Sequence, residues 1–380
     1  MIYLDHAATT YVKKEVLEEM LPYFDVKYGN PSSLYSIGKA NKLAIDKARV
    51  QVAKVINASE KEIFFTSCGS ESNNWALKGI AFANKDKGNH IITSSIEHPA
   101  ILNACKYLES QGFKVTYLAV DKDGLINLEE LENSITDKTV LISIMFANNE
   151  IGTIEPIQEI SYIAKKHNIY LHTDAVQAVG NVEIDVDKIG IDMLSMSAHK
   201  FYGPKGMGVL YVKEGTVIDN FMHGGGQESG KRAGTENVAG IVGIGKAIEL
   251  AYSDFYEKNS KLIKLRERLI NGVTERITCV KLNGHRNRRL PGNVNFSFDG
   301  VDGESILLML NMKGIYVSTG SACSSSSSKP SHVLTAIGLN DEMCKGSIRL
   351  TIGDENTEED IEYTIDALEK VVERLREIKK

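Results

Sequence analysis

The sequence of 380 residues contains few cysteines, and their positions exclude two common cysteine-based structures. The five cysteines stand at positions 68, 105, 279, 323 and 344. None of them belongs to a C-x-x-C pair, so neither a zinc knuckle nor a disulfide framework is indicated. Because free thiols persist in a reducing compartment, we expect a cytoplasmic protein.

Long apolar runs and an excess of positive charge are also missing. No run approaches the roughly 20 apolar residues that a membrane-spanning helix needs. The first ten residues, MIYLDHAATT, lack the basic start and the apolar core of a signal peptide. The net charge is −6, from 44 Lys and Arg against 50 Asp and Glu. General binding to nucleic acid or to an anionic membrane is therefore not expected.

What the sequence does contain, from about residue 45 to 215, is an alternation of short β-rich runs and helical patterns. The predicted strands are 62–66, 90–94, 114–120, 140–146, 169–173, 193–198 and 208–212. Most of these runs are too continuously apolar to face water, and turn formers bound them. Strands joined by crossover helices form a largely parallel sheet covered on both faces, so the predicted fold class is α/β. Ligands bind such sheets at the carboxyl ends of the strands.

The pattern changes after the glycine-rich stretch 223–237. A long charged helical stretch is followed by shorter strands and helices, and the chain closes with a helix for which Thr357 is a candidate N-cap. We therefore predict two domains. Residues 15–255 form the large one, and residues 1–14 together with 256–380 form a smaller α+β domain.

A lysine and an aspartate follow two neighbouring strands of the predicted sheet. Asp174 stands in HTDAVQAVG and Lys200 in SMSAHKFYGPKG. Taken alone, Lys200 has the pattern of a solvated surface lysine. Together, the two residues indicate pyridoxal phosphate (PLP), which needs a lysine for an imine and an acid beside its pyridinium nitrogen.

A phosphate site is predicted between the strand 62–66 and a helix that begins near Glu71. Free N–H groups and the positive end of that helix would bind a phosphate, and Ser70 adds a hydroxyl. Ser197 and His199, on either side of the predicted imine lysine, can reach the same phosphate. Such turns also serve as ordinary helix caps, which is the alternative interpretation.

Three other patterns are rejected as chemical sites. The stretch GIVGIGKA at 240–247 approaches a P-loop, but Ala247 replaces the hydroxyl that would hold magnesium. Lys205 lies beyond a Gly-Pro turn and is a poorer imine lysine. No histidine has metal-ligand spacing, so no resident metal is expected.

The motifs, taken in order, resemble those of the cysteine desulfurases, the NifS/IscS-type, class-V aminotransferase-like enzymes of fold type I. They are YLDHAATT, GNPSS, TSCGSESNN, EHPA, NNEIGT, TDAVQAVG, SAHKFYGPKG, HGGGQE, RAGTEN, STGSACSS and IRLTIG, and they cover the whole chain. The resemblance implies a PLP-dependent transferase with a mostly parallel seven-stranded sheet in its large domain and a smaller α+β domain.

The resemblance implies roles around the cofactor ring. Lys200 matches the lysine that holds PLP as an imine, and Asp174 matches the partner of the pyridine nitrogen. Gln177 matches the donor to the 3-oxygen of the ring. His98 matches a histidine that stacks on the ring and is a candidate acid/base, the alternative being a helix-capping surface histidine. Asn149 matches a residue that contacts both the cofactor and the substrate α-carboxylate.

The resemblance also implies phosphate and carboxylate contacts. The residues that match phosphate contacts are Gly69, Ser70, Ser197 and His199. Thr235 matches a threonine that reaches the phosphate in the partner subunit, which implies a homodimer with shared active sites. Arg349 matches the second group that holds the substrate carboxylate, a task that suits the planar fork of arginine.

Cys323 lies in the stretch STGSACSSSSSKPS, residues 318–331. The composition predicts a mobile, hydrated loop. The resemblance makes Cys323 the thiol that takes sulfur from L-cysteine, leaving L-alanine and a persulfide. The implied acceptor of that sulfur is an iron–sulfur scaffold protein or another sulfur-accepting protein. Any contact of Cys323 with a metal cluster would be transient, during transfer.

Other interpretations remain open, and two segments depart from the family pattern. The alternative activities are those of a selenocysteine lyase and of a cysteine sulfinate desulfinase, and a non-catalytic sulfur-relay or scaffold protein is the alternative outside enzymes. Cys68 and Ser70 stand where the family usually has Gly and Thr. Residues 353–357 read GDENT where the family often has GRFTT, a change that we expect to make the active-site entrance more acidic.

Overall fold

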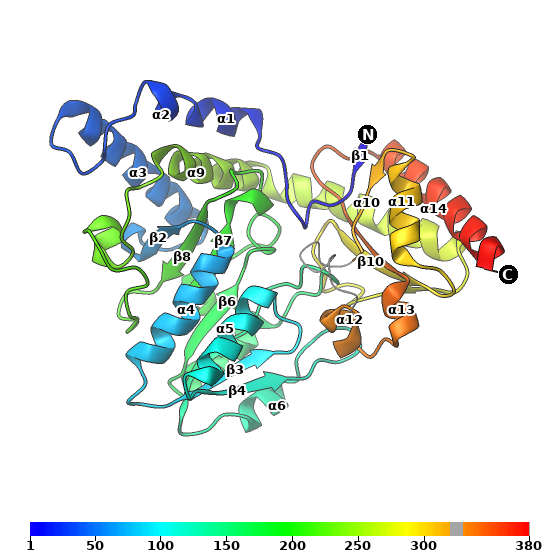
Figure 1. The fold of residues 1–380 in the computed structure, drawn as a ribbon, viewed down its shortest axis with the longest axis horizontal. Coiled ribbons are helices and arrows are strands. Elements are labelled where there is room, and N and C mark those ends of the chain that lie inside the picture. Colours follow the sequence, from blue (N-terminus) through cyan, green and yellow to red (C-terminus); the bar gives the residue numbers. More distant parts are fainter. Residues whose placement is uncertain (320–329, 380) are drawn as a thin grey trace.

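The computed structural model describes residues 1–319 and 330–379, arranged as in Figure 1. Within these residues, a seven-stranded sheet has the strand order β2-β8-β7-β6-β5-β3-β4. The strands are β2 Ile63–Thr66, β3 His90–Ser94, β4 Lys114–Leu118, β5 Thr139–Ser143, β6 Tyr170–Asp174, β7 Met193–Ser197 and β8 Gly208–Val212. β8 runs antiparallel to both its neighbours, and the other pairs are parallel. The predicted α/β class and the mostly parallel sheet are confirmed.

Helices cover both faces of this sheet because successive strand residues point to opposite sides. Phe64 and Ile91 pack in one apolar cluster with the first set of helices, α4 Gly69–Ala83 and α5 Pro99–Ser110. Their neighbours Phe65 and Ile92 pack in another cluster on the opposite face. The helices of that cluster include α3 Ser36–Val55, α7 Ile157–Lys166, α8 Val186–Ile189 and α9 Val238–Ser253. The buried strands therefore carry apolar residues without alternation, as the sequence shows.

A second set of elements surrounds a separate apolar core, which includes Leu262, Phe296 and Ile361. Its strands are β1 Ile2–Tyr3 paired with β11 Ile315–Tyr316, and β9 Val280–Leu282, β10 Asn293–Phe298 and β12 Ser347–Thr351 in order β12-β10-β9. Its long helices are α10 Phe255–Arg276, α11 Gly303–Asn311 and α14 Glu358–Lys379. Figure 1 shows these helices grouped beside the N-terminus, away from β2 and α4.

Shorter helices complete the fold. They are α1 Lys14–Met20, α2 Pro22–Asp25, α6 Leu128–Asn133, α12 His332–Ala336 and α13 Asp341–Lys345, with 3-10 turns η1 Glu60–Glu62, η2 Ala198–Lys200 and η3 Gln227–Gly230. In the part of the chain that the structure describes, no helix is both long enough and apolar enough to cross a bilayer. The predicted domain boundary falls at the junction of α9 and α10. The division stays a prediction, which the separate cores support.

One segment connects the two cores and reaches the site described below. We call residues 4–10 the N-terminal segment. At one end, Leu4 belongs to the second core and accepts a backbone hydrogen bond from Thr351 in β12 (2.7 Å). At the other end, the Thr10 N–H donates to the carbonyl of His199 in η2 (3.0 Å). The segment therefore lies across the carboxyl end of the large sheet.

Candidate active site

The predicted lysine and aspartate face one cavity at the carboxyl ends of β6 and β7. Asp174 is the last residue of β6, and Lys200 ends η2, which directly follows β7. The cavity has a volume of about 210 Å³. The predicted site residues that line it are Gly69, Ser70, His98, Asn149, Asp174, Gln177, Ser197, His199, Lys200 and Arg349. The fold thus brings together residues from motifs that are far apart in the sequence.

Asp174 is held by two donors. It is 5% exposed, and it accepts hydrogen bonds from Asn73 Nδ2 (2.6 Å) and from the backbone N–H of Val176 (3.0 Å). Each carboxylate oxygen takes one of these bonds. Because both donors belong to rigid elements, the carboxylate is fixed at the wall of the cavity.

The side chain of Lys200 points to the N-terminal segment. Its Nζ donates to the carbonyls of Ala7 (2.6 Å) and Ala8 (2.8 Å). Gln177 Nε2 donates to the same carbonyl of Ala7 at 3.0 Å. Two residues at the centre of the predicted cofactor site therefore share one backbone acceptor.

His98 both caps a helix and lines the cavity, so the two interpretations of this residue hold together. It is the N-cap of α5, where its Nδ1 accepts from the N–H of Ala100 (3.1 Å). Burial lowers the pKa of His98; the nearby Asp174 raises it and the nearby Lys200 lowers it, with a net decrease. The ring is therefore neutral at pH 7, with its proton on Nε2 because Nδ1 is an acceptor.

The N-terminus of α4 forms an anion site. The N-cap, Cys68, makes no side-chain hydrogen bond to the helix within the described residues, so the first-turn N–H groups lack a side-chain partner. A Cβ at Gly69 would lie 2.7 Å from Cγ2 of Val176, so glycine keeps this space open. Burial raises the pKa of Glu71, but hydrogen bonds with Arg232 and Ser67 bring that pKa below its ordinary value. Glu71 thus turns away from the anion site.

His199, the second histidine of the cavity, lies beside this anion site. Its Nδ1 is 3.0 Å from Oγ1 of Thr9. Burial, together with the charges of Lys200 and Lys205, lowers the pKa of His199 to about 4. The ring is neutral at pH 7 and contacts an anion through an N–H rather than through a net charge.

Arg349 also lines the cavity, and one of its donors is unused in the described residues. The residue is 1% exposed and lies on β12. Its Nη2 contacts Oδ1 of Asp5 (2.7 Å), and its Nη1 donates to the carbonyl of Asn149 (3.0 Å). Its Nε has no hydrogen-bond partner in the described part of the chain. A buried donor without a partner is costly unless a ligand satisfies it, and a carboxylate suits a guanidinium.

Comparison with known families gives this geometry its chemical context. The profile of the family described as "Aminotransferase class-V" matches residues 2–364. The chain belongs to the class-V aminotransferase family. The predicted family and fold type are confirmed, and PLP, on which this family depends, is confirmed as the cofactor.

This class-V aminotransferase is similar to named relatives along nearly its whole length. It is 61% identical over 379 residues to "Cysteine desulfurase IscS" from Clostridium botulinum (strain Hall), covering 99% of this chain and 96% of the relative. The solved structure of a "NifS-like protein" is 41% identical, with a TM-score of 0.93, over 98% of this chain and 100% of the other. The structure "SspA in complex with cysteine" is 40% identical, with a TM-score of 0.84, over 94% and 100%.

The cavity of the class-V aminotransferase fits PLP. The open N-terminus of α4 at Gly69 and Ser70 would hold the phosphate, and Asp174 would face the pyridinium nitrogen. Gln177 and His98 line the same cavity, as residues that would hold the ring. The fit rests on the uncapped helix, on the space that glycine leaves, and on a buried carboxylate that accepts hydrogen bonds from two neutral donors.

Two predicted residues stand apart from this cavity. Thr235 is exposed and lies outside the described residues that line it. Cys323 lies outside the described residues altogether. The roles given to both by the resemblance stay predictions.

The structure adds residues for which the motifs predicted no role. Asn73 supports Asp174, Asp5 pairs with Arg349, and the carbonyls of Ala7 and Ala8 hold Lys200. All of them lie in the motifs YLDHAATT and TSCGSESNN. The motifs marked the segments as functional, but only the fold shows which partner each residue contacts.

The residues 353–357, which we call the 353–357 turn, do not make the cavity entrance acidic as expected. Asp354 pairs with Lys13 (2.6 Å) and Glu355 with His6 (2.9 Å). The described residues that line the cavity do not include this turn. Its acids are directed at the N-terminal part of the chain, where Lys13 and His6 contact them.

Proposed function

We propose that this class-V aminotransferase is a cysteine desulfurase, which converts L-cysteine and an acceptor thiol into L-alanine and a persulfide. The observation that carries the proposal is that the residues flanking the Cys323 stretch on both sides lie beside the cavity. Ser318 and Arg349 exchange two backbone hydrogen bonds (3.1 and 2.6 Å), and His332 Nε2 donates to the carbonyl of Glu97 (2.9 Å). Both ends of the Cys323 stretch therefore lie at residues of the cavity or next to them.

The reach of the chain supports this assignment. Cys323 follows Thr319 by four residues, which span at most about 14 Å when extended. Its thiol is thus within reach of a substrate whose carboxylate lies at Arg349. The names of the relatives, cysteine desulfurase, and a similar structure in complex with cysteine point to the same substrate.

Each residue of the cavity has a task in this proposal. Bound PLP supplies a ring that accepts the electron pair left at the substrate Cα. Lys200 Nζ removes the proton from that Cα, and Asp174 holds the proton on the ring nitrogen. Arg349 and Asn149 bind the α-carboxylate and so orient the substrate. Gln177 donates to the 3-oxygen of the ring.

Cys323 takes the sulfur as a thiolate. The Cβ–Sγ bond of the substrate breaks, an S–S bond forms on Cys323, and the substrate carbon gains a proton to become the methyl group of alanine. An ordinary cysteine has a pKa of about 8.5, so the site must favour its thiolate at pH 7. We assign a part of that task to His98, which lines the cavity: its Nδ1 accepts from Ala100, so its Nε2–H is left to donate to the sulfur and stabilise the thiolate.

The first test separates the two central residues. Cys323→Ala should abolish alanine formation from L-cysteine while the visible absorbance of the bound cofactor remains. Lys200→Ala should change that absorbance itself. Cys279→Ser, at an exposed free cysteine, is the matched control and should leave both readouts unchanged. Normal turnover by Cys323→Ala would refute the persulfide step.

The alternative activities differ in the substrate rather than in the site. L-selenocysteine and L-cysteine sulfinate carry the same α-carboxylate and amine, so Arg349 and Lys200 would treat them alike. Comparing kcat/KM on the three substrates ranks the activities. A rate on cysteine far below the other two would favour a selenocysteine lyase or a sulfinate desulfinase.

We also propose a homodimer with shared active sites. Large apolar side chains are exposed on α2, on α3 and on the connection between them, including Phe24 (65%), Tyr28 (72%), Leu34 (86%) and Leu43 (69%). Monomeric proteins rarely expose so many large apolar groups in one region. Thr235 is exposed as well, which suits a residue that acts in the cavity of a partner.

Mixed dimers test the sharing of sites. Dimers of Lys200→Ala with Thr235→Ala chains should regain one intact site, because that site takes Lys200 from one chain and Thr235 from the other. We expect up to half the wild-type activity per dimer, measured after mixing and refolding. If mixing restores nothing while sedimentation shows dimers, the sites are not shared.

The persulfide requires an acceptor. We propose an iron–sulfur scaffold protein or another sulfur-accepting protein, in the cytoplasm, where a thiol stays reduced. Transfer of labelled sulfur from the wild type, compared with Cys323→Ser, identifies acceptors.

We also propose that the chain divides into two domains at residue 255. Limited proteolysis near Asp254 tests this division.

A further inference from the structure

The 353–357 turn, where this chain departs from the family pattern, is built against the N-terminal segment. Glu355 Oε1 lies 2.9 Å from His6 Nε2, and Asn356 Nδ2 donates to the carbonyl of Tyr3 (3.3 Å). The side chain of Asn356 also accepts from the N–H of Gly353 (2.8 Å), which closes the turn. The turn therefore contacts the chain immediately before the carbonyls that hold Lys200.

His6 is fixed by contacts on all sides. It is 7% exposed, and its Nδ1 donates to the carbonyl of Thr351 (2.8 Å). Its Nδ1 faces a carbonyl and its Nε2 faces the Glu355 carboxylate, so the ring is held through both nitrogens. A Cβ at Gly353 would overlap the His6 ring, so the ring lies directly on this glycine.

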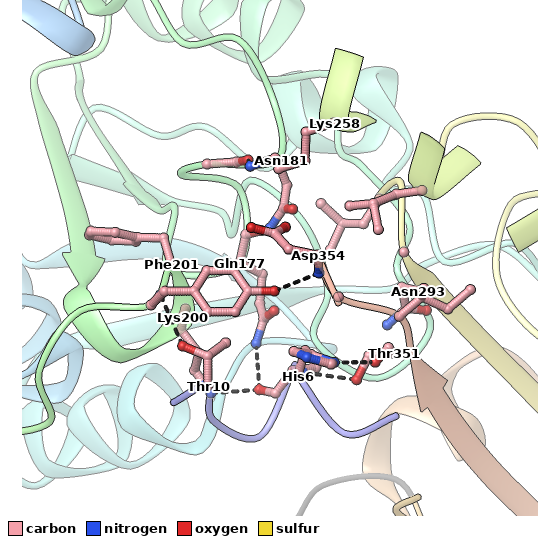
Figure 2. A pocket seen from close by; sticks show the side chains of 18 residues that line it. His6, Thr10, Gln177, Asn181, Lys200, Phe201, Lys258, Asn293, Thr351 and Asp354 are labelled. Atoms are coloured by element: carbon pink, nitrogen blue, oxygen red, sulfur yellow. Dashed lines mark hydrogen bonds between the residues drawn. The ribbon is translucent and has the colours of Figure 1, made fainter. Parts of the chain in front are cut away.

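The next residues connect His6 to the cavity. The N–H of Ala7 donates to Oγ1 of Thr351 (2.9 Å), and the carbonyl of Ala7 accepts from Lys200 and from Gln177. Figure 2 shows His6, Gln177 and Lys200 around one pocket, with Thr351 next to His6, and Gln177 and Lys200 line the catalytic cavity as well. A shift of the His6 ring would therefore move the acceptors of Lys200.

We propose that His6 and Glu355 are positioning residues for Lys200: the hydrogen bond between them holds the N-terminal segment so that the carbonyls of Ala7 and Ala8 stay aimed at Nζ. The inference rests on the proposed function, in which Lys200 carries the proton of the substrate Cα. It assigns a task to the GDENT sequence that the family resemblance leaves without one.

The two partners should contribute unequally. The side chain of Glu355 is 37% exposed, so solvent screens its charge, whereas His6 is buried against Gly353. His6→Ala should lower kcat about 10- to 100-fold, the range that a misplacement of about 1 Å produces. KM for L-cysteine should stay within a few-fold, because Arg349 still binds the carboxylate. Glu355→Ala should give a smaller loss, and Glu355→Gln, which keeps an acceptor for Nε2–H, should restore most of it.

A readout without cofactor or substrate separates positioning from general damage. In cofactor-free protein, the labelling of Lys200 by an amine-selective reagent is compared with that of the exposed Lys61 by mass spectrometry. Two carbonyl acceptors protect the Lys200 amine, so His6→Ala should speed its labelling relative to Lys61. Glu359→Ala, an exposed acid four residues beyond Glu355, is the matched control and should change neither kcat nor labelling.

Two outcomes would overturn the inference. One is unchanged labelling of Lys200 in His6→Ala, and the other is an equal kcat loss in Glu355→Gln and Glu355→Ala. A thermal unfolding scan of each variant checks that the fold is kept. If the wild type makes no alanine from cysteine, the proposed function fails, but the labelling comparison still tests the His6–Glu355 pair by itself.

Discussion

Replacing Arg349 by lysine tests how the cavity recognises its substrate. A lysine ammonium keeps a positive charge opposite Asp5, so the carboxylate of Asp5 is not left unpaired. The substitution removes Nη1, which contacts the carbonyl of Asn149, and it removes the unused Nε. Hydrogen bonds to charged groups contribute about 1.5–3 kcal/mol. The affinity for a carboxylate ligand should therefore fall about 10- to 140-fold, at 1.4 kcal/mol per factor of ten.

Two ligands that differ by the carboxylate isolate this effect. L-alanine, the proposed product, has the α-carboxylate, and ethylamine lacks it. Their dissociation constants are obtained from changes in the visible absorbance of the bound cofactor. Arg349→Lys should weaken L-alanine by the factor above and leave ethylamine nearly unchanged. Arg268→Lys, at a partly exposed arginine on α10, is the control and should affect neither ligand.

An equal loss of affinity for both amines would refute this reasoning. In that case, Arg349 would act by holding the N-terminal segment through Asp5 rather than by binding the carboxylate. Asp5→Asn would then reproduce the Arg349→Lys result with both ligands.

Three further predictions follow from local geometry. Gly69→Ala places a methyl group 2.7 Å from Val176 Cγ2 and should weaken PLP much more than pyridoxal, which has no phosphate; rescue by Val176→Ala checks the cause, and equal weakening would contradict it. Burial lowers the pKa of His172 to about 3, so the unfolded chain binds a proton there between pH 6.5 and 3 that the folded chain does not. The free energy of unfolding should therefore fall as the pH is lowered from 6.5 to 3. Urea titrations of His172→Gln should show a smaller decrease over the same pH interval. Glu228→Ala leaves the nearly buried Arg49 without its carboxylate (2.7 Å) and should cost about 3–5 kcal/mol in urea unfolding, whereas a cost below about 1 kcal/mol would mean that water replaces the pair.

The sequence was sufficient to predict the large sheet and the site residues at the carboxyl ends of its strands. Buried parallel strands carry continuous apolar runs, so all seven predicted runs of the large sheet appear as strands. Two keep the predicted bounds, and five are shifted, such as β5 at Thr139–Ser143 in place of 140–146. Asp174 and Lys200 follow adjacent strands, and parallel strands bring their ends to one edge. The cavity shared by these two residues follows from that rule.

The contacts between the two cores were not predictable in this way. Asp5 and Arg349 pair across 344 residues, and no spacing along the chain encodes such a distance. The acids of the 353–357 turn were expected at the cavity entrance because they follow Arg349 closely in the sequence. The sequence does not show where their side chains point. Their partners, His6 and Lys13, are set by how the N-terminal segment packs on β12.

The N-terminal segment has a consequence for the order in which a ribosome completes this enzyme. Its residues are made before the large sheet, but its backbone partner Thr351 is made some 345 residues later, roughly 20 to 70 s at ordinary rates of synthesis. The large sheet, with Lys200 in place, is complete long before. Until β12 emerges, the carbonyls of Ala7 and Ala8 have no fixed position. The nascent chain therefore carries its lysine without the acceptors that hold it, and the site is assembled only after β12 has emerged.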